Sequence, residues 1–318
     1  MSWSGDGSRE AAMVPPAEVD TYYGRPVLKP PVWKEDIAYY FFLGGLAAGA
    51  SLLAAGADQT GRLRLRRGTR LGAVGAIGLG AIFLVRDLGR PDRFHHMLRV
   101  AKPTSPMSVG TWLLTAYAPL AGTAALAEVL PRRWRRTTLG RLVDTAARPA
   151  GVAAALAAPA VAAYTAVLIA DTAVPAWNEG RDLLPFVFSA SAAASAGGLG
   201  MLVAPPEEAA PARRLAQYGA LVELVASRQL ERRRSPSVEA YLTGDARRCL
   251  TRARGLTAGG VLLSMLLGRR SRLAAAVSGA ALLAGGFYER LWIFRAGVAS
   301  TKEPRTTVRR TPQAPART

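Results

Sequence analysis

The chain has 318 residues, of which 50% are hydrophobic, and a formal net charge of +19. An apolar composition with so large a basic excess leaves two broad classes, a membrane protein or a protein that binds polyanions. A single Cys excludes a disulfide scaffold, a thiolate zinc site and a Cys-ligated iron–sulfur cluster in this chain. The two His residues are adjacent, which excludes an intramembrane haem held by His from two helices. We therefore expect no metal, no haem and no cluster in this chain.

The N-terminal segment, residues 1–36, lacks the apolar stretch of a signal peptide. We expect no cleavable signal peptide, and a segment that is mostly disordered or interfacial. Beyond it, four stretches without Asp, Glu, Lys or Arg are each long enough to cross a bilayer, which takes about 20 residues. They are residues 37–57, 103–127, 149–170 and 183–206.

Shorter apolar stretches are weaker candidates for spans. Residues 71–85, 255–268 and 273–288 are flanked by Arg, whose long side chain can reach the interface from inside a helix end. Residues 215–230 are interrupted by Glu223. Because these stretches are not amphipathic, we expect an all-α integral membrane protein rather than a soluble helical one. It has about eight transmembrane helices, or seven if the Glu223 segment lies on the surface.

The basic residues gather in the connections between the spans. They are Arg62, Arg64, Arg66, Arg67 and Arg70; Arg132, Arg133, Arg135 and Arg136; Arg232, Arg233 and Arg234; and Arg269, Arg270 and Arg272. A nucleic-acid interface would need them on one folded face. These basic residues instead alternate with membrane spans along the chain. This pattern indicates contacts with lipid headgroup phosphates, and no nucleic-acid partner. Basic residues in the short loops are nearly balanced between the two sides, so the positive-inside rule does not decide the orientation.

The densest polar stretch, residues 86–112, joins the second and third spans. It contains two carboxylates, two imidazoles and several Arg. A quinone site needs such groups, as hydrogen-bond partners for two carbonyls and as a titratable proton donor. The alternative is an interfacial loop whose ions pair with each other and with lipid phosphates.

Residues 87–112 closely resemble the signature of the NrfD/polysulfide reductase membrane-subunit family. Further resemblances are at residues 22–33 with 39–49, at 172–177 and at 296–300. This resemblance implies two four-helix bundles, residues 37–173 and 183–298. The composition of residues 299–318 indicates a basic disordered tail. The resemblance also implies a multi-pass subunit in the cell membrane that binds an exchangeable quinone, menaquinone or ubiquinone. The partners implied are an iron–sulfur electron-transfer subunit and a molybdopterin catalytic subunit, as in a formate-dehydrogenase-like complex.

Carried onto this sequence, the family's quinone pocket lies at the start of the first span and in the signature loop. The quinone-binding candidates are Glu35, Asp36, Tyr39, Tyr40, Asp87, Arg90, His95 and His96. Polysulfide-reductase-type members have Asn and His near the first span, where this sequence has carboxylates and Tyr. The alternative for the tyrosines is an aromatic belt at the membrane interface. We assign docking of the iron–sulfur partner to residues of the same loop: Arg93, Lys102, Ser105, Met107, Ser108 and Trp112.

Four acids lie at or inside span ends. They are Glu128, Asp171, Glu223 and Glu289. Because intramembrane carboxylates are candidates for function, we consider them for a proton path; the alternative is an ion pair with a neighbour such as Arg290.

Two other functions compete with the quinone-reactive subunit. One is a secondary transporter or channel whose Gly-rich spans are broken helices around a central site. The other is a passive membrane anchor that binds the partner without quinone chemistry. Co-purification with an iron–sulfur subunit separates the transporter from the other two.

Overall fold

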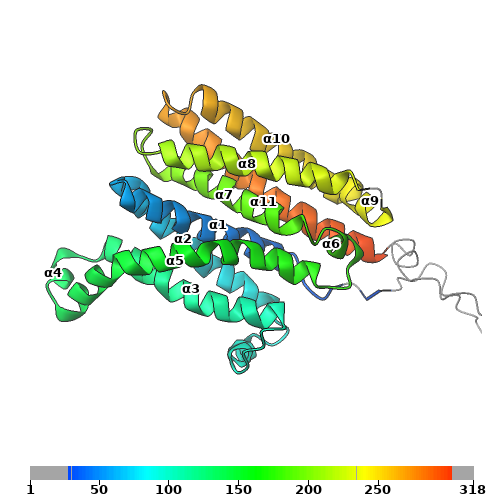
Figure 1. The fold of residues 1–318 in the computed structure, drawn as a ribbon, viewed down its shortest axis with the longest axis horizontal. Helices are drawn as coiled ribbons and strands as arrows, with labels where there is room; N and C mark the ends of the chain where they lie inside the picture. The colour runs from blue at the N-terminus through cyan, green and yellow to red at the C-terminus, as the bar shows by residue number, and fades with distance from the viewer. Residues whose placement is uncertain (1–27, 30, 234, 303–318) are drawn as a thin grey trace, which may run out of the picture.

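The computed structural model describes residues 28–29, 31–233 and 235–302. Within these residues the chain is all-helical, with eleven α-helices and one 3-10 helix (Figure 1). Most of the N-terminal segment 1–36 and of the tail 299–318 lies outside the described residues, and so does Arg234. The expectation of disorder in these two segments therefore stays a prediction.

The helices follow one another with short connections. Those of the first half are α1 (Asp36–Gln59), α2 (Leu63–Asp87), η1 (Pro91–Leu98), α3 (Pro106–Val129), α4 (Arg132–Arg135) and α5 (Thr138–Ala170). Those of the second half are α6 (Pro175–Glu179), α7 (Leu184–Val203), α8 (Ala210–Glu231), α9 (Pro236–Leu242), α10 (Gly244–Leu266) and α11 (Arg272–Lys302).

Local sequence explains where α3 and α5 begin. Ser105 precedes α3, and its side chain accepts a hydrogen bond from the backbone N–H of Ser108, with Pro106 in the first turn. Thr137 precedes α5 and accepts from the N–H of Gly140 over 3.1 Å. Ser and Thr before a helix satisfy backbone donors that have no partner inside it.

Five helices are long and apolar enough to cross a membrane: α1, α2, α3, α5 and α7. Each of the four charge-free stretches lies largely within one of these helices, which confirms the prediction that they are candidate spans. Residues 71–85 form most of α2. The chain is a multi-pass membrane protein. Residues 215–230, 255–268 and 273–288 are helical too, in α8, α10 and α11. These three helices contain charged residues along their length, so they are less apolar than the other five.

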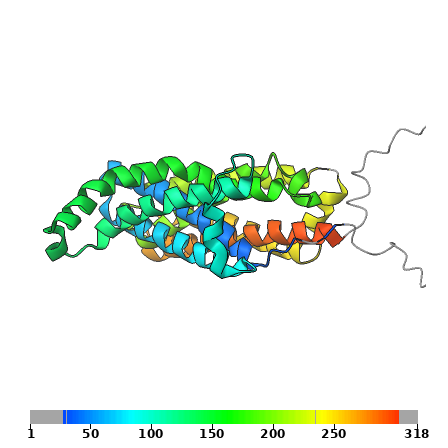
Figure 2. The same cartoon turned by 90° about the horizontal axis from the view of Figure 1, so that it is seen from below.

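The long helices lie side by side in two views (Figures 1 and 2). α1 packs mainly on α2, α5 and α7, and α3 packs on α5. α7 packs on α8 and α11, and α10 packs on α11. The contact of α1 with α7 therefore joins the first half of the chain to the second.

Small residues allow this close packing. A Cβ atom on Gly49 of α1 would lie 2.7 Å from the backbone oxygen of Ala192 in α7. A Cβ on Gly198 of α7 would lie 2.7 Å from the backbone oxygen of Gly279 in α11. Larger side chains would separate these helices, so the small residues of the spans serve helix association as expected in lipid.

One end of the molecule is rich in buried aromatic side chains. Its largest members are Tyr40, Phe41, Trp177, Tyr241 and Trp292, which belong to four different helices. Trp177 donates from Nε1 to the backbone oxygen of Ile293 over 2.8 Å, and Trp292 donates to that of Tyr241 over 2.9 Å. Paired indole donors keep this aromatic cluster ordered, and the candidate site lies against it.

Candidate functional site

A cavity of about 70 Å³ lies where α1 begins, lined by residues of α1, α2, η1, α3 and α5. Tyr40 and Asp87 contribute its polar groups, together with Thr111 and Tyr164. Most of the remaining lining is apolar, including Trp33 and two methionines. A largely apolar cavity with a few convergent polar groups is typical of a site for a small organic molecule.

Three carboxylates fix the chain at the start of α1. Asp87, the last residue of α2, accepts a hydrogen bond from the backbone N–H of Lys34 over 2.9 Å. Asp36 lies 3.7 Å from Nε of Arg86, and Glu35 lies 2.8 Å from Nη2 of Arg295 in α11. The acids predicted from the sequence therefore come together, and they connect α1 to α2 and α11.

Tyr40 lines the cavity with a polar group that lacks a partner. Its side chain is 2% exposed, and its hydroxyl has no hydrogen-bond partner among the described residues. Leaving a buried hydroxyl unpaired costs about 1–3 kcal/mol. A carbonyl oxygen of a ligand in the cavity would relieve that cost by accepting a hydrogen bond from the Tyr40 hydroxyl. Tyr39 differs, because its ring packs between Phe83 and Phe287, with centroids 5.3 and 5.4 Å away.

The remaining quinone candidates lie outside this cavity. Arg90, His95 and His96 are exposed, and the two imidazole rings contact each other edge to face at 4.5 Å. Their neighbour Met97, at the end of η1, does line the cavity. The signature loop thus covers the cavity with apolar side chains and turns its imidazoles outward.

The residues assigned to partner docking form an ordered exposed surface at the start of α3. Ser108 donates to the backbone oxygen of Val100 over 3.0 Å and accepts from the N–H of Lys102 over 2.9 Å. Trp112 also donates to Val100, over 3.4 Å, yet stays 42% exposed. Arg93, Lys102 and Met107 are exposed as well, and Met107 also lines the cavity.

A second cavity of about 370 Å³ adjoins the first and shares Trp33 and Met107 with it. Its lining includes Lys29 and Thr301, together with residues 172–174 of the segment before α6. Segments that are far apart in the sequence, and that resemble the family separately, therefore meet around these two cavities.

Tyr164 and Thr111 are polar lining residues that sequence reasoning missed. Tyr164 is half-buried in α5, and a Cβ on Gly110 would lie 2.4 Å from its ring. The available signal was a Tyr inside the otherwise small and aliphatic stretch 149–170. That signal does not say which face of α5 looks toward α3, so only the fold identifies it.

Comparison with known proteins shows which family the chain belongs to. The family described as "Polysulphide reductase, NrfD" matches residues 27–208, more than half of the chain. The chain belongs to the NrfD family. The matched residues include almost all of the lining of both cavities, and Thr301 is the exception.

One curated relative is the C subunit of polysulfide reductase from Wolinella succinogenes. It is 32% identical over 173 residues, which cover 50% of this chain and 54% of that protein. The match therefore spans about half the length of the relative.

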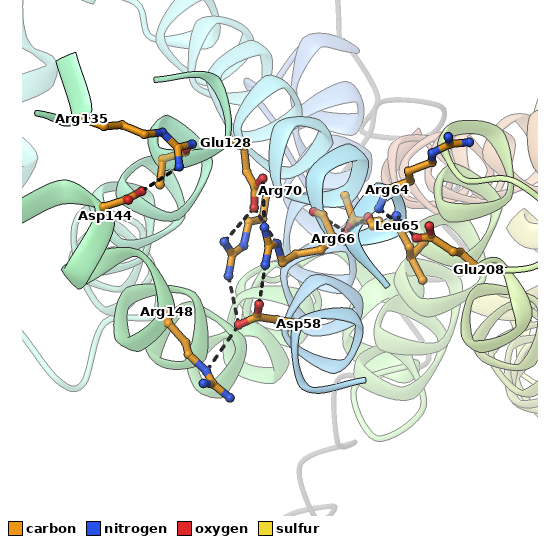
Figure 3. A network of polar contacts seen from close by, with 12 residues as sticks. Asp58, Arg64, Leu65, Arg66, Arg70, Glu128, Arg135, Asp144, Arg148 and Glu208 are labelled. Atoms are coloured by element: carbon orange, nitrogen blue, oxygen red, sulfur yellow. Dashed lines mark hydrogen bonds and ion pairs between the residues drawn. The ribbon is translucent and has the colours of Figure 1, made fainter. Parts of the chain in front are cut away.

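The four acids considered for a proton path have very different surroundings in this NrfD-family chain. Glu128 lies at the opposite end from the cavities, in a network with Arg66, Arg70 and Asp58 (Figure 3). Its Oε1 accepts from Nε of Arg66 over 2.7 Å and from Nη1 of Arg70 over 2.9 Å. Asp171 follows α5 and is exposed.

Glu223 and Glu289 form a buried cluster with Arg290 in the second half of the chain. Their side chains are 3%, 2% and 2% exposed, and Glu289 forms an ion pair with Arg290. Arg290 also donates to the backbone oxygen of Phe188 over 2.7 Å. Two carboxylates thus face one guanidinium, while Oε2 of Glu223 and Oε1 of Glu289 lack hydrogen-bond partners among the described residues.

No group of three or more His, Cys, Asp or Glu that could hold a metal ion occurs among the residues that the structure describes. Cys249 is buried, and Nη1 of Arg295 lies 3.4 Å from its sulfur. The titratable and hydroxyl groups that line the two cavities are Tyr and Thr hydroxyls, the Asp87 carboxylate and the Lys29 ammonium, which suit hydrogen bonding and proton exchange.

Proposed function

We propose that this chain is the quinone-reactive membrane subunit of a multi-subunit oxidoreductase. The observation that carries the proposal is the cavity at the start of α1, where the unpaired hydroxyl of Tyr40 and the carboxylate of Asp87 line one largely apolar space. A quinone, menaquinone or ubiquinone, supplies exchangeable two-electron and two-proton chemistry when bound.

The residues present fit a quinone head group. The Tyr40 hydroxyl is free to donate a hydrogen bond to a carbonyl oxygen, and such a bond would satisfy an otherwise unpaired buried group. Asp87 is only partly buried and lies at the end of a helix, so its carboxylate is placed to exchange protons between the cavity and water. Glu35 and Asp36 hold α1 in place through their Arg partners.

We further propose that the exposed loop above the cavity binds an iron–sulfur subunit, which in turn connects to a molybdopterin catalytic subunit. The similarity to a protein named as the C subunit of polysulfide reductase supports membership of such a complex. Arg93, Lys102 and Trp112 offer charge and an exposed indole, the kind of surface that protein interfaces use. His95 and His96 are exposed on the same loop and are equally placed for this contact.

We propose eight spans in two four-helix bundles, residues 37–173 and 183–298. α8, α10 and α11 have 22, 23 and 31 residues. At 1.5 Å per residue each exceeds about 30 Å, the thickness of the hydrocarbon core. They pack alongside α7, an apolar helix, or alongside one another, and this arrangement supports counting them as spans.

Glu223 and Glu289 are the acids that we propose for proton transfer, because each has a buried oxygen without a partner among the described residues. Glu128 is compensated by two guanidinium groups, so we assign it a structural role instead. Asp171 is exposed and could act only at the surface.

Purification of the complex from membranes, followed by titration with a menaquinone analogue, tests the proposal. We expect an iron–sulfur subunit and a molybdenum enzyme to co-purify, and the analogue to oxidise or reduce the clusters. Replacing both Tyr40 and Asp87 should abolish this response. Isolation of the chain alone, with substrate flux in proteoliposomes, would indicate a transporter. Co-purification without a quinone response would indicate a passive anchor.

A further inference from the structure

The connection between α3 and α5 extends beyond the body of the molecule at the end opposite to the cavities (Figures 1 and 2). We call residues 130–148 the α4 arm; it comprises α4 and the first turns of α5. α5 has 33 residues and is therefore about 50 Å long, against about 30 Å for the hydrocarbon core. Its charge-free part begins at residue 149, so the preceding turns project out of the core.

The α4 arm is held in a defined conformation. Thr137 donates to the backbone oxygen of Trp134 over 2.6 Å while it caps α5. Arg135 donates to the backbone oxygens of Ala127 and Leu130, at the end of α3. It also pairs with Asp144 over 3.3 Å (Figure 3). These contacts connect α3, α4 and α5, so the arm presents its other side chains in fixed positions.

Four arginines of the α4 arm are exposed and have no acidic partner among the described residues. They are Arg132, Arg133, Arg136 and Arg141. The neighbouring network differs, because Arg66, Arg70 and Arg148 are compensated there by Asp58 and Glu128 (Figure 3). The arm thus presents four uncompensated charges at this end of the molecule, where the side chains of Arg62, Arg64 and Arg67 also have no ion pair among the described residues.

Apolar side chains on the same arm are exposed as well. Trp134, Leu139 and Leu142 are 53%, 65% and 64% exposed. Leu139 and Leu142 are three residues apart and lie on one face of α5. Arg next to exposed Trp and Leu is the composition of segments that lie in the headgroup region of a membrane.

We propose that the α4 arm binds anionic phospholipid headgroups of the membrane that α3 and α5 cross. Guanidinium groups form paired hydrogen bonds with phosphate oxygens, and four uncompensated arginines offer them here. Trp134, Leu139 and Leu142 enter the boundary between headgroups and acyl chains. The inference needs α3 and α5 to be spans, but it does not need a quinone.

The test uses the full-length protein in detergent and labelled phosphatidylglycerol as the probe. The triple variant Arg132→Gln/Arg133→Gln/Arg136→Gln should bind phosphatidylglycerol at least roughly tenfold more weakly, which is the effect of losing one charge-assisted hydrogen bond to a phosphate. Binding of phosphatidylcholine should not change. Unchanged binding of phosphatidylglycerol would overturn the proposal.

A matched control removes equal charge from the same end of the molecule. Arg62→Gln/Arg64→Gln/Arg67→Gln lies at the start of α2, outside residues 130–148. We expect it to weaken binding of phosphatidylglycerol less than the arm variant does; an equal loss would show a general charge effect and overturn the assignment to the arm.

Fluorescence tests the apolar contact separately in nanodiscs that contain brominated lipid. The emission of the wild type minus that of Trp134→Phe gives the emission of Trp134 alone. We expect brominated lipid to quench this emission strongly. An unquenched Trp134 would place the arm in water and contradict the proposal, as would capture of an acidic protein in place of lipid.

Discussion

The carboxylate of Asp87 accepts a hydrogen bond from the backbone N–H of Lys34 over 2.9 Å, although 53 residues separate the two. This contact joins the end of α2 to the segment that leads into α1. Since Asp87 also lines the smaller cavity, the same side chain positions the chain and faces the proposed quinone. A substitution at Asp87 can therefore remove its charge and still keep the hydrogen bond that positions the chain.

Replacing Asp87 by Asn should keep the position and remove the charge, because Asn retains a carbonyl acceptor for Lys34. We expect Asp87→Asn to bind a menaquinone analogue nearly as the wild type does, while its turnover falls at least roughly tenfold. Asp87→Ala should also weaken binding, by about fivefold for one hydrogen bond lost. Titration of the analogue and quinone-dependent turnover measure the two effects. Equal binding by both variants would contradict the positioning role.

Replacing Tyr40 by Phe should weaken quinone binding without lowering stability. The hydroxyl is buried and has no partner among the described residues, so its removal costs no internal hydrogen bond. We expect about a fivefold rise in the dissociation constant of the analogue, the worth of one hydrogen bond.

Tyr117→Phe is the matched control for Tyr40→Phe. The Tyr117 hydroxyl is also buried, but it donates to the backbone oxygen of Ala47 over 2.7 Å. It also lies 2.8 Å from the side-chain hydroxyl of Ser51. This variant should lose about 1–3 kcal/mol of stability and keep its affinity for the analogue. The opposite pattern would argue against Tyr40 as the donor.

Replacing Glu128 by Gln should destabilise the protein and leave quinone turnover intact. The change removes the carboxylate that faces both Arg66 and Arg70, of which Arg70 is only 6% exposed. Because Asp58 still pairs with both guanidinium groups, we expect a loss of about 1–3 kcal/mol, less than for a buried charge left without a partner. Thermal unfolding in detergent gives the stability, and loss of turnover at wild-type stability would restore Glu128 to a proton path.

Glu223 and Glu289 should be coupled through Arg290. Either single change to Gln leaves one carboxylate to balance the buried guanidinium, whereas the double change leaves none. We expect the double variant to be less stable than the sum of the single effects by about 1–3 kcal/mol. Denaturation of all four proteins measures this coupling energy. Additive effects would show that Glu223 does not compensate Arg290.

Several features could be predicted because they depend on local composition. The charge-free stretches mark spans, since no neighbour can remove the cost of a charge in hydrocarbon. The resemblance of residues 87–112 indicated the family and pointed to Asp87. The same reasoning did not distinguish Tyr39 from Tyr40, because adjacent residues on a helix face different neighbours. Tyr39 packs against Phe83 and Phe287, and Tyr40 lines the cavity.

The sequence by itself determined that the chain is a helical membrane protein of the NrfD type, with its polar chemistry near the start of the first span. Tertiary structure alone decided which polar groups share a cavity, since that depends on how distant helices are rotated against one another. It brought Tyr164 to Tyr40, paired Glu128 with two arginines and left Glu223 facing Glu289. Burial and partners give a carboxylate its role, and both come from packing between helices far apart in the chain.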